Sequence, residues 1–148
     1  MAETKYGKHI ITGITKVMGH NFDGTSMLSH DGELNADVSI GYHCLFNTKY
    51  AHEGPHTHDF HELLCFIGGN PLDINDFGAE IHMCLGEEQE KHIITSPSVV
   101  SIPPGLTHCP LTVVKCDKPI VFLEISLTSK FGSSEMDAAR EKEESGDK

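Results

Sequence analysis

Four residues of this chain carry the side chains of a transition-metal site: His56, His58, Glu62 and His108. The first three lie within one short segment, PHTHDFHE at 55–62, and the fourth ends the segment IPPGLTH at 102–108. Three imidazoles and one carboxylate form a ligand set that first-row divalent metals accept. In an octahedral ion this set leaves two positions open for water, dioxygen or a chelating substrate. The sequence therefore predicts a metal centre that is able to do chemistry.

The spacing of these residues fits β-strands better than a helix. Residues two apart in a strand project from the same face, so His56 and His58 are expected side by side. Glu62 keeps the same parity in a continuous strand, and a bend at Asp59–Phe60 would instead bring it in from a neighbouring strand. His108 must come from another strand, after the rigid Pro-Pro-Gly turn that precedes it.

Short β-rich runs make up most of the chain before residue 128. Gly, Pro, Asn and Asp, which favour turns, separate them. The runs are His9–Val17, Val38–Phe46, Leu63–Ile67, Ala79–Leu85, His92–Thr95, Val99–Ile102, Leu111–Lys115 and Ile120–Leu127. Many short strands with frequent turns predict an all-β sandwich or barrel over residues 1–128. The segment 129–148 is rich in charge and poor in apolar residues, which predicts a flexible tail.

Two connecting segments have a recognisable composition. GEEQEK at 86–91 is typical of an acidic hairpin turn between two strands. Residues 69–77 form a longer polar loop, which we expect at the rim of a pocket.

Composition limits the partners and the compartment. The 148 residues are typical of one domain, and 11 Lys and Arg against 22 Asp and Glu give a net charge of −11. This balance argues against nucleic-acid binding and against attraction to an anionic membrane. It does not exclude an anionic substrate, because the charge of a bound metal would determine the electrostatic potential inside the pocket. The five cysteines include no C-x-x-C pair, and the first ten residues lack an apolar signal segment, so we expect a cytoplasmic protein with reduced thiols.

The two motif segments resemble those of the cupins, a superfamily of small β-barrel proteins. The first cupin motif, G-x5-H-x-H-x3,4-E-x6-G, is matched from its first histidine onward by His56, His58, Glu62 and Gly69. The second motif, G-x5-P-x-G-x2-H-x3-N, is matched at its centre by Pro103, Gly105 and His108. The sequence departs from the motifs at Tyr50, Pro97 and Thr112, none of which is a metal ligand in the family.

This resemblance covers residues 38–127 and implies a jelly-roll barrel, the double-stranded β-helix. It implies one divalent transition metal on the four motif ligands, with Fe(II) as first choice and Mn(II), Ni(II), Co(II) or Zn(II) as alternatives. It also implies a homodimer, for which His9–Val17 is the candidate edge strand. The reaction is left open, because one fold hosts many functions.

Proton transfer beside a metal needs a further side chain, and the candidates are His82, Tyr42 and His43. His43 and His82 lie within predicted strands and could reach the pocket, although isolated histidines are more often structural. Tyr42, or Tyr50 in its place, could supply a phenolic proton, although barrel packing is the commoner role of a tyrosine.

Three other residues near the motifs are open to more than one interpretation. Alternation within the run IVFLEIS favours a solvent-exposed Glu124 over a buried one near the metal. His61 has the opposite parity to Glu62, so we expect it off the metal, with a ligand swap as the alternative. Cys109 is expected to pack inside the barrel, with a thiol beside the metal as the alternative.

The favoured function is a metal-dependent enzyme for a small polar molecule with chelating oxygen atoms. It would act as an isomerase or lyase, or as an Fe(II) dioxygenase, and both need the same four ligands. The alternative is a non-catalytic binding or sensor protein, which would need a protein partner, with 129–148 as the docking segment. A storage protein ranks last, because storage cupins generally lose their metal ligands.

Overall fold

The structure is a computed structural model that describes residues 4–12, 24–29, 32–52 and 54–130. These residues form nine strands and a short 3₁₀ helix, which confirms the all-β prediction. The elements are η1 (Gly7–His9), β1 (Gly24–Ser29), β2 (Ser39–Leu45), β3 (Ala51–His52), β4 (Glu62–Gly68), β5 (Ala79–Leu85), β6 (Glu90–Ile94), β7 (Ser98–Ile102), β8 (His108–Cys116) and β9 (Ile120–Ser126). Within the described ranges, no helix is long and apolar enough to cross a membrane.

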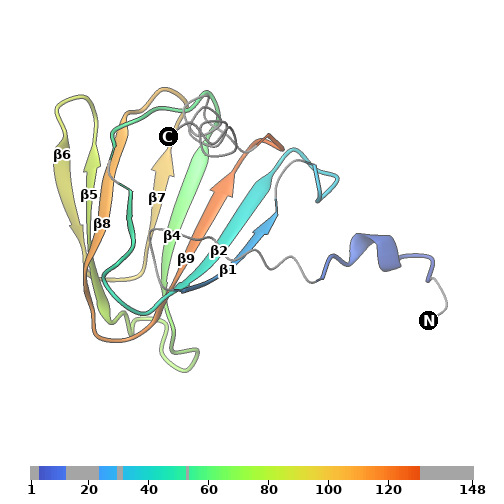
Figure 1. The fold of residues 1–148 in the computed structure, drawn as a ribbon, viewed down its shortest axis with the longest axis horizontal. Helices are drawn as coiled ribbons and strands as arrows, with labels where there is room; N and C mark the ends of the chain where they lie inside the picture. The colour runs from blue at the N-terminus through green and yellow to red at the C-terminus, as the bar shows by residue number, and fades with distance from the viewer. Residues whose placement is uncertain (1–3, 13–23, 30–31, 53, 131–148) are drawn as a thin grey trace, which may run out of the picture.

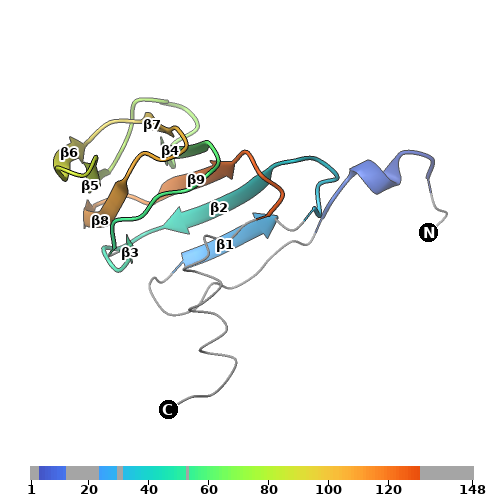
Figure 2. The same cartoon turned by 90° about the horizontal axis from the view of Figure 1, so that it is seen from above.

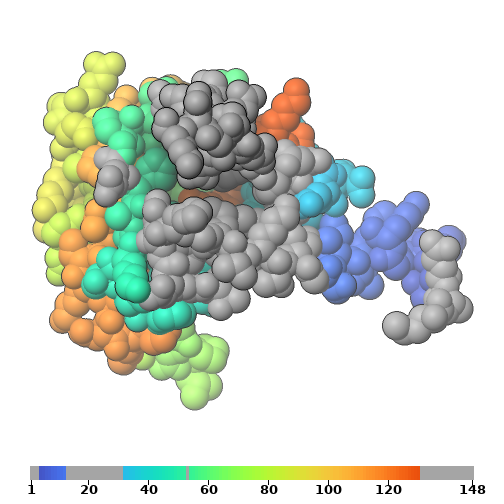
Figure 3. All heavy atoms as spheres, in the orientation of Figure 1, coloured from blue at the N-terminus to red at the C-terminus, as the bar shows by residue number. Residues whose placement is uncertain are grey.

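The strands form two antiparallel sheets around a common interior (Figures 1 and 2). One sheet has the order β1-β2-β9-β4-β7 and the other β3-β8-β5-β6. From β2 to β9 the chain changes sheet at every connection except the β5–β6 hairpin. This repeated crossing is the topology of a jelly roll. Residues 4–12, which include η1, project to one side of the sheets (Figures 1 and 3).

Strand alternation sends apolar side chains into the interior. On β5, Ile81 and Met83 are almost fully buried, and His82 between them faces the other way. Across β4 and β9, Phe66 and Phe122 are directly opposite and stack with ring centroids 4.9 Å apart. Burying an apolar side chain of this size contributes about 1.5–3 kcal/mol. Most of the interior is therefore a packed apolar core. Polar residues, among them Glu62 and His108, are also buried there.

The predicted strands agree with the observed ones over much of the chain. Ala79–Leu85 has the predicted bounds, and the acidic turn before β6 is also confirmed. The run His9–Val17 is wrong in its first part, because His9 ends η1 and residues 10–12 have no regular structure; 13–17 lie outside the described residues. Most of the predicted tail, 131–148, lies outside them too.

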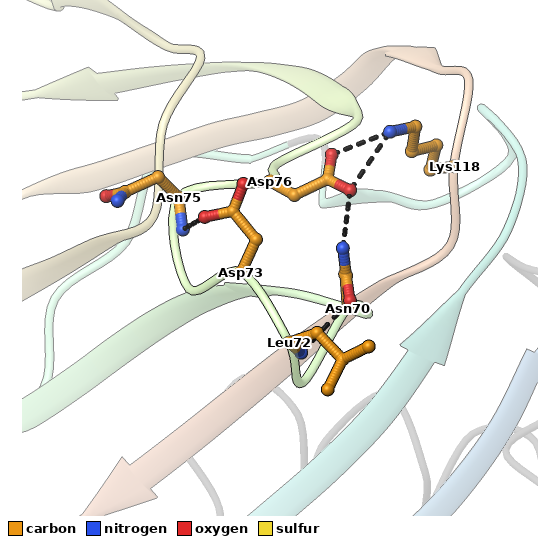
Figure 4. A network of polar contacts seen from close by, with 6 residues as sticks. All are labelled: Asn70, Leu72, Asp73, Asn75, Asp76 and Lys118. Carbon is orange, nitrogen blue, oxygen red and sulfur yellow. Dashed lines mark hydrogen bonds and ion pairs between the residues drawn. The ribbon is translucent and has the colours of Figure 1, made fainter.

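The loop after β4 is held by its own polar network (Figure 4). Lys118 Nζ donates to both carboxylate oxygens of Asp76, at 2.7 and 3.0 Å, and Asn70 Nδ2 donates to the same carboxylate at 3.0 Å. A hollow of about 260 Å³ lies between this network and Pro119. The loop follows the last residue of β4, whereas Glu62 is its first, a strand length of roughly 20 Å away. The loop therefore rims a pocket, as expected, but this pocket lies at the other end of β4 from Glu62.

Candidate metal centre

Three imidazole rings converge at one end of the barrel. The potential ligand atoms of His56, His58 and His108 all lie within 4.8 Å of one another. The ring centroids are separated by 4.2 Å for His56–His108, 4.7 Å for His56–His58 and 5.0 Å for His58–His108. His108 begins β8, whereas the other two precede β4. Three histidines at this separation can bind one ion together.

Backbone contacts fix this convergence. His56 and His108 form an isolated β-bridge, in which the amide of each donates to the carbonyl of the other at 3.0 Å. Gly105 N donates to His58 O at 2.8 Å, and Gly105 has a φ of 82°, which favours glycine. His56 and His58 lie side by side, as expected, although only His56 is bridged, and the chain bends at Asp59–Phe60 before Glu62 begins β4. Both residues are held by backbone hydrogen bonds from the second motif segment: His108 bonds to His56, and Gly105 bonds to His58.

The orientation of two imidazoles is set by backbone carbonyls. His56 Nδ1 donates to Gly54 O and His108 Nδ1 donates to Leu106 O, both at 3.0 Å. A carbonyl oxygen only accepts, so the proton of each neutral ring is on Nδ1. Nε2 of each ring therefore presents a lone pair to the centre. Histidines that ligate metals are oriented in this way.

Glu62 completes the donor set. Its carboxylate is buried, and Oε2 lies 3.3 Å from His108 Nε2 and 3.7 Å from His58 Nε2. His108 Nε2 is itself buried and has no hydrogen-bond partner among the described residues. A carboxylate oxygen thus faces an imidazole lone pair, and two acceptors in contact repel unless a cation lies between them. The residues present therefore fit a divalent metal ion.

His58 is held from its other side by an aromatic ring. Phe60 stacks on it with centroids 4.6 Å apart and an interplanar angle of 14°. Burial lowers the pKa of His58, against the opposing effect of Glu62, and the neighbouring histidines lower it further. The neutral form is the one that binds a metal.

A second polar group lies inside the barrel, between β2 and β9. His43 Nε2 and Glu124 Oε2 are 2.9 Å apart, with side chains that are 2% and 19% exposed. The preference for an exposed Glu124 was wrong, because the inner face of β9 is Ile120, Phe122, Glu124 and Ser126. Its outer face also carries apolar residues, so the sequence shows no clear alternation there.

Tyr50 and Cys109 share this interior. Tyr50 packs edge-on against Phe122, with centroids 5.4 Å apart. Burial and the nearby Glu124, Cys109 and Glu62 raise the pKa of Tyr50 well above its usual value. Burial, Glu62 and Glu124 also raise the pKa of the Cys109 thiol, to about 12. Both groups are neutral near pH 7 when no metal is bound.

Several residues singled out from the sequence lie elsewhere. Tyr42 is on the outer face of β2 and 37% exposed, between two buried neighbours. His82 Nε2 contacts Glu80 Oε1 at 2.6 Å on the outer face of β5. His61 contacts Ser101 Oγ at 2.7 Å, away from the rings, as expected. The structure brings His43 into the interior but not Tyr42 or His82, because neighbouring residues of a strand face opposite sides.

Comparison with known proteins gives matches in fold alone. No protein-family model matches the chain, and a search of curated proteins found no match. Among solved structures, peruvianin-I, a cysteine peptidase from Thevetia peruviana latex, matches with a TM-score of 0.57 and 17% identity over 87% of this chain and 77% of its own. Oxalate decarboxylase from Bacillus subtilis, which has Mn(II) centres, matches with a TM-score of 0.51 and 17% identity over 76% of this chain. An RmlC-like cupin from Shewanella frigidimarina has a TM-score of 0.49 and 11% identity, over 79% of this chain and 84% of its own.

The chain spans 27% of the length of the oxalate decarboxylase. The two-sheet topology, the two motif segments and the matches above a TM-score of 0.5 agree with one another. The chain has the cupin fold, and its inward-facing donor residues suit a metal ion. At these identities, the matches carry no information on the reaction.

Proposed function

We propose that this protein is a metal-dependent cupin enzyme that acts on a small polar molecule with oxygen donors. One observation carries the proposal: Glu62 Oε2 lies 3.3 Å from the buried Nε2 of His108, which has no hydrogen-bond partner among the described residues, in a cluster of three imidazoles. His56, His58, Glu62 and His108 would hold one divalent transition metal. Fe(II) is our first choice, and Mn(II), Ni(II), Co(II) and Zn(II) accept the same ligands.

The bound metal would supply Lewis acidity to an oxygen atom of the substrate. The chain itself would move the proton, through His43 and Glu124. Their contact of 2.9 Å would let a proton pass between the two side chains, which are only 2% and 19% exposed. Such a pair can take a proton from carbon or oxygen and return it to another position of the same molecule.

Tyr50 would contribute a neutral phenol. Its raised pKa keeps the hydroxyl protonated at neutral pH, so it can donate a hydrogen bond to a negatively charged oxygen. A proton-moving pair beside a neutral donor favours proton-transfer chemistry, such as isomerisation, elimination or decarboxylation. An Fe(II) dioxygenase would use the same metal ligands but would not need the pair.

The test is turnover of a panel of hydroxy acids, keto acids and dicarboxylates, with and without dioxygen, after loading with each candidate metal. We expect turnover without dioxygen, and a loss of about 10²–10⁴-fold in Glu124→Gln with metal binding retained. Glu80→Gln is the matched control, since Glu80 pairs with a histidine on the outer face. Turnover that requires dioxygen and survives Glu124→Gln would contradict the proton-transfer assignment.

A further inference from the structure

We propose that His52, His56 and Cys109 form a second ligand set, for a thiophilic metal ion, and that this set competes with the three-histidine set for His56. Each residue offers one ligand atom, and the two imidazole nitrogens and Cys109 Sγ all lie within 4.8 Å of one another. Two nitrogens and a sulfur at this separation suit a three-coordinate or four-coordinate ion that prefers thiolate, such as Cu(I) or Zn(II).

The fold places the cysteine in the interior by breaking the alternation of β8. His108 and Cys109 are consecutive, yet they are only 1% and 4% exposed. Between β5 and β8, Met83 is opposite Leu111 and Leu85 is opposite His108, so one residue of β5 faces two of β8. This β-bulge coincides with a φ of 73° at Cys109, which side chains with a Cβ rarely adopt. The thiol is thereby turned toward the imidazoles.

His52 points to a ligand independently. Its Nδ1 is buried and has no hydrogen-bond partner within the described ranges. Its ring centroid is 4.6 Å from that of His56, and β3 pairs it with Leu111 of β8. A buried polar nitrogen without a partner is unfavourable, and a metal ion would satisfy it.

His56 can serve only one set at a time. Its Nδ1 donates to Gly54 O, so Nε2 is the only nitrogen left to bind a metal. The carboxylate and imidazoles of the first set favour harder ions, whereas the thiol favours softer ones. When an ion binds to the second set, the S–H bond of Cys109 breaks, the sulfur electron pair binds the ion, and the proton passes to water. No oxidation state changes.

The test is the affinity of the full chain for Cu(I) without dioxygen, measured by competition with a chromophoric Cu(I) chelator. We expect Cys109→Ser and His52→Ala each to weaken Cu(I) binding at least tenfold. His58→Ala and Cys44→Ser should leave it unchanged, since His58 belongs only to the first set and Cys44 lies on the outer face of β2. Mn(II) binding, followed by electron paramagnetic resonance, should survive Cys109→Ser, which also shows that this variant folds.

Two results would overturn the proposal. One is Cu(I) binding that is absent in the native chain or equally tight in Cys109→Ser and His52→Ala. The other is a Cu(I)-loaded protein that still binds Mn(II) as tightly as the empty protein. Because the two sets share His56, bound Cu(I) should weaken Mn(II) binding. Cu(I) binding that is lost in His58→Ala but retained in Cys109→Ser would assign Cu(I) to the three-histidine set instead.

Discussion

His56 and His108 exchange two backbone hydrogen bonds of 3.0 Å, although they come from separate motif segments. The bridge fixes the two backbones before any ligand binds, and carbonyls two residues upstream orient both rings. The site is therefore preorganised by hydrogen bonds that the metal does not supply.

The Gly105 turn should matter more for metal binding than for stability. Gly105→Ala puts a Cβ at a φ of 82°, which costs about 1–3 kcal/mol of unfolding free energy, and it disturbs the bond to His58 O. Gly32→Ala is the matched control, with a φ of 79° and equally open surroundings. We expect similar losses of stability by thermal unfolding, but weaker metal binding, by about tenfold, only in Gly105→Ala. Equal metal affinities would contradict the positioning role of the turn.

Glu62→Gln should stabilise the metal-free protein and weaken metal binding. The amide can donate to His108 Nε2, which now faces a carboxylate oxygen at 3.3 Å, so an unfavourable contact becomes a hydrogen bond. We expect a gain of about 1 kcal/mol in the presence of chelator and a loss of at least tenfold in metal affinity. Thermal unfolding and metal titration measure the two effects. A less stable metal-free Glu62→Gln would show that the contact is not repulsive.

The two histidine–glutamate pairs on opposite faces should differ in their contribution to stability. Glu124→Ala leaves His43 buried without this carboxylate, and we expect a cost of about 1–3 kcal/mol. Glu80→Ala removes the partner of His82 on the outer face, where a cost of at most ~1 kcal/mol is expected. Chemical denaturation of both variants at pH 7 makes the comparison, and equal costs would argue against a specific interior pair.

The loop network should be visible in the titration of Asp76. The hydrogen bond from Lys118, with a second from Asn70, lowers the pKa of the Asp76 carboxyl. A carboxyl with a lowered pKa stabilises the folded state above its unfolded pKa, and this contribution is lost as the pH falls through the folded value. Lys118→Gln should therefore raise the pKa of Asp76, as measured by carboxyl-carbon NMR. Lys115→Gln, which removes a lysine paired with Asp117 instead, should not; an equal shift in both would rule out the direct contact.

The sequence predicted the fold and the proximity of His56, His58, Glu62 and His108, because both depend on local pattern. The strand Ala79–Leu85 alternates clearly, and the donors have a fixed spacing around two turns. Glu124 was misplaced because the run around it is apolar on both faces. Tyr42 and His43 are consecutive residues of one strand, so only one of them can face the interior. The sequence does not show which one does.

Other features depend on which strands pair in the folded protein, and the sequence of one segment does not show this. β3 is two residues long and β1, GTSMLS, has little apolar alternation, so neither was predicted. The burial of Cys109 was expected, but the burial of both His108 and Cys109 depends on a bulge opposite β5, which the alternation rule does not predict. The approach of His52 to His56 follows from the pairing of β3 with β8.

Metal content tests the central claim most directly. The protein should be purified without chelator and without dioxygen, and its metals measured by elemental analysis beside His108→Ala and His82→Ala. We predict about one equivalent of a divalent transition metal in the native chain and in His82→Ala, and a loss of most of it in His108→Ala. Metal absent from the native chain even after reconstitution, or retained equally in His108→Ala, would contradict a metal centre at this site.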